Sequence, residues 1–92
     1  MPPSTSAADL LLAIAEPTRL RIVNCLAAAP LFVSDLQAVL DLPQPTVSRH
    51  LQVLRRADLV VDTPVAQFVL CRLRRAVQRA AERSRSHTRV RV

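Results

Sequence analysis

The chain has 92 residues, a formal net charge of +6 and a hydrophobic content of 50%, which together allow one small domain with a single core. It contains no glycine and two aromatic residues, which excludes glycine-rich phosphate loops and the aromatic platforms of single-stranded nucleic-acid binders. No apolar run is long enough to cross a bilayer and no basic segment follows Met1, so we expect a cytoplasmic protein without a signal peptide.

The positive charge is concentrated at the C-terminal end. Residues 1–71 contain five arginines and six acidic residues, for a net −1, whereas residues 72–92 contain eight arginines and Glu82, for a net +7. Such a block can bind nucleic acid or an anionic surface, or it can solvate one face of a helix.

Two helices are expected at the start of the chain. Ser6 can cap a helix over 9–15, which is too apolar for one buried stripe and therefore indicates a partner surface. Pro17 suits the first turn of a second helix over 17–28. The short apolar run 31–33 is compatible with one extended strand.

The next two helices have the outline of a helix-turn-helix. Ser34 and Gln37 fit a capping box for a helix over 34–40. The three residues 41–43 then lead to a helix over about 44–56. Two short helices joined by such a turn are typical of DNA-binding proteins, in which the second helix enters the major groove.

The periodicity changes after residue 58. Apolar runs at 59–61 and 67–71 flank the turn residues 62–66, which predicts a β-hairpin. A helical pattern returns over about 73–85, and residues beyond it show no core pattern.

The predicted order is helix, helix, possible strand, helix, helix, hairpin, helix. This order predicts a mainly α fold with a small β-hairpin, that is, a winged helix-turn-helix. We expect the domain to span residues 7–86, with flexible termini at 1–6 and 87–92.

The helix over 44–56 has one apolar and one polar face. Val47, Leu51 and Leu54 recur at the spacing of a buried helical face. Arg49 is the strongest candidate for a guanine edge or a phosphate, because a guanidinium can bind either in a bidentate manner. The alternative is an ordinary solvated face. The residues that we expect to contact DNA are Gln44, Thr46, Ser48, Arg49, His50, Gln52, Arg55 and Arg56.

Three of these positions have narrower expectations. We expect His50 to pack and form hydrogen bonds beside the groove, since no companion metal ligand lies at a usable spacing. Arg55 and Arg56 are expected to meet the DNA backbone or to solvate the end of the helix.

Four stretches of the chain carry a family resemblance: AEPTRLRI at 15–22, VSDL at 33–36, QPTVSRHLQVLR at 44–55 and LV at 59–60. On these stretches the chain resembles the ArsR/SmtB family of bacterial winged-helix repressors over roughly residues 9–75. The resemblance implies a homodimer joined by its first and last helices. It also implies a palindromic operator in double-stranded DNA, repression, and an inducer whose identity is unknown.

The chain departs from the family's pattern at three places. Metal-sensing members carry a Cys-Val-Cys motif where residues 32–34 are Phe-Val-Ser, and the last helix offers only Glu82 and, beyond it, His87. We therefore expect no metal and no cofactor. The wing at 62–67 has no Arg, Lys or Gly, although the family's wing is usually basic, so we expect a weaker phosphate contact there.

The two cysteines and the apolar first helix leave alternatives open. Cys25 and Cys71 are expected to be buried and to pack as small hydrophobic residues. Alternatively, they form a redox-switched disulfide, which requires their Cα atoms to lie within about 7 Å, or a thiol-based sensor of metalloids. A protein-interaction module that docks a partner through the first helix is a further alternative, motivated by Asp62 and Pro64 in the wing. No enzyme is expected, because no nucleophile, base and orienting group form a set.

The last predicted helix also allows several interpretations. Its arginines can extend the DNA contact, form a solvated face, or belong to an amphipathic helix on an anionic membrane, although the opposing apolar face is short. We favour DNA or solvent over a membrane. The arginines concerned are Arg72, Arg74, Arg75, Arg79 and Arg83.

Overall fold

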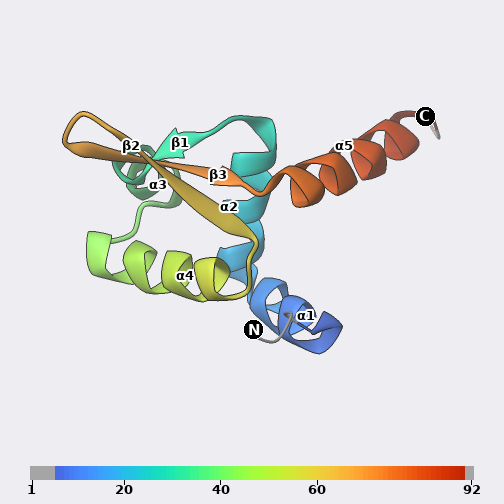
Figure 1. Cartoon of the computed structure of the whole chain (residues 1–92), viewed down its shortest axis with the longest axis horizontal. Helices are drawn as coiled ribbons and strands as arrows, with labels where there is room; N and C mark the ends of the chain where they lie inside the picture. The colour runs from blue at the N-terminus through green and yellow to red at the C-terminus, as the bar shows by residue number, and fades with distance from the viewer. Residues whose placement is uncertain (1–5, 91–92) are drawn as a thin grey trace.

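The computed structural model describes residues 6–90, and for residues 85–90 the backbone alone. Its order of elements confirms the predicted winged helix-turn-helix (Figure 1). The expectation of flexible ends at residues 1–5 and 91–92 lies outside the described residues. The elements are α1 (Ala7–Ala15), α2 (Pro17–Ala28), β1 (Leu31–Phe32), α3 (Val33–Leu40), α4 (Gln44–Arg56), β2 (Val60–Val65), β3 (Phe68–Leu73) and α5 (Arg75–Val90).

The core lies where α2, α3 and α4 meet the three-stranded sheet. The predicted apolar face of α4 is fully buried at Val47, Leu51 and Leu54. These side chains pack with Ile22 and Leu26 of α2 and with one face of the sheet. Removing a buried leucine from such a core costs about 2–5 kcal/mol, so this packing sets the orientation of α4.

The start of α3 differs from the predicted capping box. Phe32, the last residue of β1, has an extended backbone, and its N–H donates to the Asp35 carboxylate at 2.9 Å. The Ser34–Gln37 box was therefore wrong, because the helix begins at Val33, with Phe32 as its N-cap and Asp35 as the third helical residue. At the other end Asp41 adopts a left-handed backbone, φ 56°, which aspartate tolerates better than most residues.

The wing is longer than predicted. The hairpin turn lies at Ala66 and Gln67, not over 62–66, and β2 continues through Pro64. Pro64 is tolerated because the strand order is β1-β3-β2, which leaves β2 at the sheet edge where a missing N–H costs little. Ala66 supplies the left-handed turn conformation, φ 54°, in a chain without glycine.

Helix α5 begins at Arg75, two residues later than predicted, because Leu73 pairs with Val60 in the sheet. Its backbone is helical to Val90, and the expectation of a flexible end at residues 87–92 stays a prediction. Val77 and Ala81, near the start of α5, are partly buried against the core. Both α5 and α1 lie at the end of the molecule away from the wing turn (Figure 1).

Candidate nucleic-acid interface

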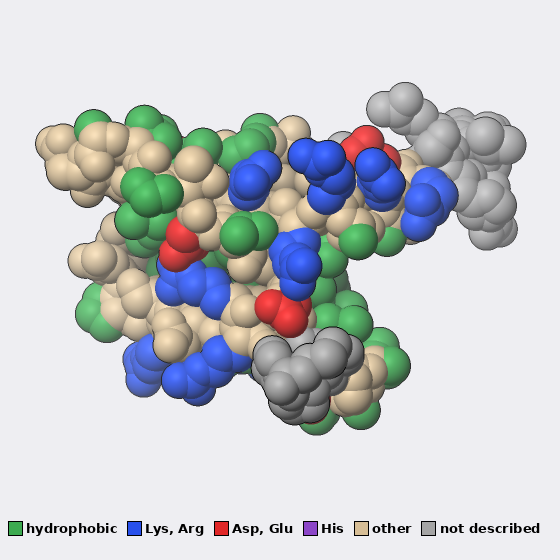
Figure 2. Space-filling view, viewed as in Figure 1, with side chains coloured by type: hydrophobic (Ala, Val, Ile, Leu, Met, Phe, Trp, Pro, Cys, Tyr) green, Lys and Arg blue, Asp and Glu red, His purple; other side chains and the backbone are tan. Residues whose placement is uncertain are grey.

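Helix α4 presents a polar face opposite its buried one. Arg49, Gln52 and Arg56 recur at i, i+3 and i+7 and are exposed, so they form the outermost stripe of the helix. Gln44 is exposed at the first turn, and the half-buried candidates are Thr46, Ser48, His50 and Arg55. Figure 2 shows basic side chains gathered along the free edge of α4 and, separately, along α5.

Arg49 and Arg55 have different environments. Within the described part of the chain, no carboxylate forms an ion pair with Arg49. The Arg55 Nε atom instead lies 2.9 Å from Asp62 Oδ2 of β2, and both side chains are about one third exposed. Arg55 thus links the end of α4 to the wing, and the acidic Asp62 has a structural partner. Neither Arg49 nor Arg56 of the exposed stripe has an ion-pair partner among the described residues.

Cys71 lies in the centre of the sheet and is fully buried. In the register it is opposite Leu31 on one side and Asp62 on the other. Burial raises the pKa of the Cys71 thiol, and the negative charge of Asp62 adds to that rise. Cys25 is half-buried on α2, and both thiols are free. A protonated buried thiol is a poor nucleophile, which favours the packing role for Cys71.

We expect native Cys71 to be alkylated by iodoacetamide at least tenfold more slowly than Cys25, because its pKa is raised and it is inaccessible. Its reaction should accelerate only at a pH above the ordinary range of a thiol. Mass spectrometry after timed quenching measures both rates, with the chain in denaturant as the control in which the two rates converge. Equal native rates would contradict the packing role.

Glu16 joins two helices to α4 and was not among the predicted site residues. It is the N-cap of α2, and its carboxylate accepts hydrogen bonds from the N–H groups of Thr18 at 3.1 Å and Arg19 at 3.0 Å. The bond from Thr18 does most to lower the pKa of Glu16; the N–H of Arg19 and the charges of His50 and Arg19 also lower it, whereas desolvation opposes them. The same Glu16 Oε2 atom that accepts from Arg19 also lies 3.4 Å from His50 Nδ1 of α4.

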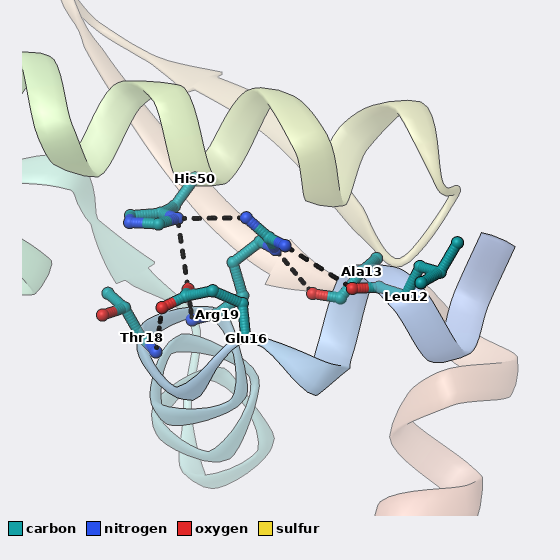
Figure 3. A network of polar contacts seen from close by, with 6 residues as sticks. All are labelled: Leu12, Ala13, Glu16, Thr18, Arg19 and His50. Carbon is teal, nitrogen blue, oxygen red and sulfur yellow. Dashed lines mark hydrogen bonds and ion pairs between the residues drawn. The ribbon is translucent and has the colours of Figure 1, made fainter.

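Arg19 completes this network of polar contacts (Figure 3). Its guanidinium donates to the carbonyl of Ala13 at 2.6 Å and to that of Leu12 at 3.5 Å, at the C-terminal end of α1. The Nη1 atom also lies 3.4 Å from His50 Nδ1. A protonated Nδ1 donates to Glu16, and an unprotonated Nδ1 accepts from Arg19, so His50 has a partner in either tautomer.

The Glu16–Arg19–His50 network therefore connects α1, α2 and α4. It places His50 as a packing and hydrogen-bonding residue beside the exposed stripe of α4. The signal for Glu16 was present in the sequence, since an acidic residue directly before a proline at the first helical position is a capping pattern. No local pattern indicated that the Arg19 side chain of α2 would contact both α1 and α4.

Two further findings concern metal sites and membrane-spanning helices. Among residues 6–84, whose side chains the structure describes, no group of three or more His, Cys, Asp or Glu side chains could hold a metal ion. Glu82 is exposed on α5, and the side chain of His87 lies outside the described residues. No helix in the described range is long and apolar enough to cross a membrane.

A helix-turn-helix whose second helix exposes a polar stripe, followed by a two-stranded wing, defines the winged-helix class of DNA-binding domains. A helix-turn-helix domain family model matches residues 14–63. The biofilm growth-associated repressor of Agrobacterium fabrum is 40% identical over 70 residues, covering 76% of this chain and 60% of that protein. The SmtB repressor of Mycobacterium tuberculosis is 40% identical over 68 residues, covering 74% of this chain and 50% of that protein.

A solved structure agrees with this match. The structure of HlyU from Vibrio cholerae has a TM-score of 0.76 at 38% identity, covering 83% of this chain and 84% of that one. The chain belongs to the ArsR/SmtB family of winged helix-turn-helix transcriptional regulators. It spans 60% and 50% of the lengths of the two curated relatives named above.

Proposed function

We propose that this chain is a homodimeric transcriptional repressor of the cytoplasm that binds a palindromic operator in double-stranded DNA. The observation that supports this most directly is the exposed stripe of Arg49, Gln52 and Arg56 on a helix whose opposite face is fully buried. The buried face holds α4 rigidly, so its polar side chains are presented together to a major groove. The curated relatives are named as repressors, and none of the names quoted above is that of an enzyme.

The Arg55–Asp62 ion pair fits the same function. It holds the wing against the end of α4. Residues 62–67 of the wing, which include no basic residue, then contribute little direct phosphate contact, and the wing acts mainly to position α4. The DNA contact falls to Arg49, Gln52 and Arg56, with Gln44, Thr46 and Ser48 at the start of the helix.

The dimer is proposed from the exposed apolar surface of α1. Leu11 is 64% exposed and Leu12 is 69% exposed, and adjacent exposed leucines are a common mark of an association surface. Because α1 and α5 lie at the same end of the molecule, a second copy can pack there and leave both α4 helices free (Figure 1). Two recognition helices about 34–36 Å apart would then contact successive major grooves.

A mobility-shift assay with the DNA upstream of the chain's own gene tests the proposal. We expect a shift that weakens steeply as salt rises, because released counterions drive arginine–phosphate binding. A matched fragment with scrambled sequence should shift only at higher protein concentration. No shift at low salt would contradict the repressor and favour the protein-interaction module.

Replacing Leu11 and Leu12 together by aspartate should convert the dimer to a monomer, because charges cannot be buried unpaired in an apolar interface. Light scattering after size-exclusion chromatography should give half the mass of the unmodified chain. Val39→Asp, on α3 and 54% exposed, is the control that should leave the mass unchanged. A double variant that remains dimeric would exclude α1 from the interface.

A further inference from the structure

A cavity of about 300 Å³ lies between the C-terminal end of α2, the end of β3 and the first turns of α5. It has an apolar floor, since Leu26 and Leu73 in its lining are 1% and 5% exposed and Ala27 is also buried. Its volume is at the lower end of the range of about 300–1,000 Å³ for small-molecule sites. Such a space suits a small, partly apolar compound.

The mouth of the cavity is basic. Arg72 and Arg75 both line it and are exposed, and no acidic residue is among the described residues of the lining. In the part of the chain that the structure describes, neither arginine forms an ion pair, whereas Arg74 between them lies 3.4 Å from Asp58. Two unpaired guanidinium groups next to an apolar floor favour a carboxylate, which they can bind in a bidentate manner.

The wall of the cavity includes the side-chain contact between α5 and α2. Gln78 Nε2 donates to the carbonyl of Ala27 at 2.9 Å. Both residues line the cavity. A compound bound there lies directly against this hydrogen bond between α5 and α2, so occupancy and the position of α5 are physically linked.

We propose that this cavity binds a small apolar carboxylate, with the carboxylate at Arg72 and Arg75 and the apolar part on Leu26 and Leu73. The bound compound alters the packing of α5 through Gln78 and thereby changes operator affinity. This second step rests on the proposed function, in which α5 belongs to the dimer interface. A phosphorylated or highly charged ligand is disfavoured because the floor offers no polar group to it.

Calorimetric titration of the full chain with octanoate tests the cavity, and octanol is the uncharged probe of equal length. We expect saturable octanoate binding and at least about tenfold weaker octanol binding, because the charge-assisted hydrogen bonds are lost. Arg72→Gln and Arg75→Gln should each weaken octanoate binding about tenfold on the same grounds. Arg79→Gln is the matched control, since it removes the same charge from α5 outside the cavity lining.

Absence of saturable octanoate binding, or an equal loss with Arg79→Gln, would overturn the proposal. Operator mobility shifts with and without octanoate test the coupling, and we expect the affinity to change at least fivefold. Occupancy with unchanged operator affinity would overturn the coupling. If the chain never shifts DNA, the proposed function is refuted. The cavity proposal is still tested in that case, because octanoate binding is measured without DNA.

Discussion

Replacing Arg49 by alanine is expected to weaken operator binding by about 1–3 kcal/mol, the cost of losing one good bidentate base contact. Arg49 lies on the exposed stripe of α4 and has no carboxylate partner within the described residues, so its guanidinium is free to meet DNA. Quantitative mobility shifts or fluorescence anisotropy on a labelled operator measure the loss. Thermal unfolding should be nearly unchanged, because the removed side chain is exposed.

Arg49→Lys distinguishes a base contact from a phosphate contact. Lysine keeps the charge but lacks the planar fork that matches a guanine edge. If Arg49 binds a guanine, the lysine variant should remain weak and discriminate less between operator and scrambled DNA. If it binds a phosphate, lysine should restore most of the affinity. An alanine variant with unchanged affinity would remove Arg49 from the interface.

Replacing Arg19 by alanine should lower the free energy of unfolding by about 1–3 kcal/mol, since hydrogen bonds to a charged group are lost. The guanidinium caps the last carbonyls of α1 and contacts His50 on α4, so its removal loosens α1 from the rest of the domain. Urea denaturation measures the change. Operator affinity should fall as well, because α4 loses one of its lateral supports and α1 belongs to the proposed dimer interface.

Arg21→Ala is the matched control for Arg19. Arg21 lies two residues further along α2, is exposed, and has no ion pair or side-chain hydrogen bond in the described range. Its removal should change stability by no more than about 0.5 kcal/mol. If both variants were destabilised equally, the network of Glu16, Arg19 and His50 would not be a structural link.

Several elements could be predicted from local pattern alone. The face of α4 formed by Val47, Leu51 and Leu54 is buried as its spacing indicated, because apolar periodicity directly specifies which side of a helix meets the core. The proline at position 17 and the serine at position 6 marked the starts of helices for equally local reasons.

Features that depend on neighbours in space were predicted wrongly or not at all. The turn was placed over 62–66 because Asp62 and Pro64 are typical turn residues, yet both lie in β2. Pairing with β3 and the edge position of β2 outweighed their local preference. Asp62 also has a long-range partner, Arg55, which no local pattern indicated.

The sequence by itself determined the class of fold, the helix that we propose contacts DNA and the positive charge at the C-terminal end, because these follow from periodicity and composition. The tertiary structure alone decided which polar side chains are available. It pairs Arg55 with Asp62, joins Arg19 and His50 to Glu16 and buries Cys71 in the sheet. Among the described residues it leaves Arg49 without an ion-pair partner. The physical reason is that charge and hydrogen-bond partners are set by distance in space, and residues far apart in sequence meet only once the core has packed.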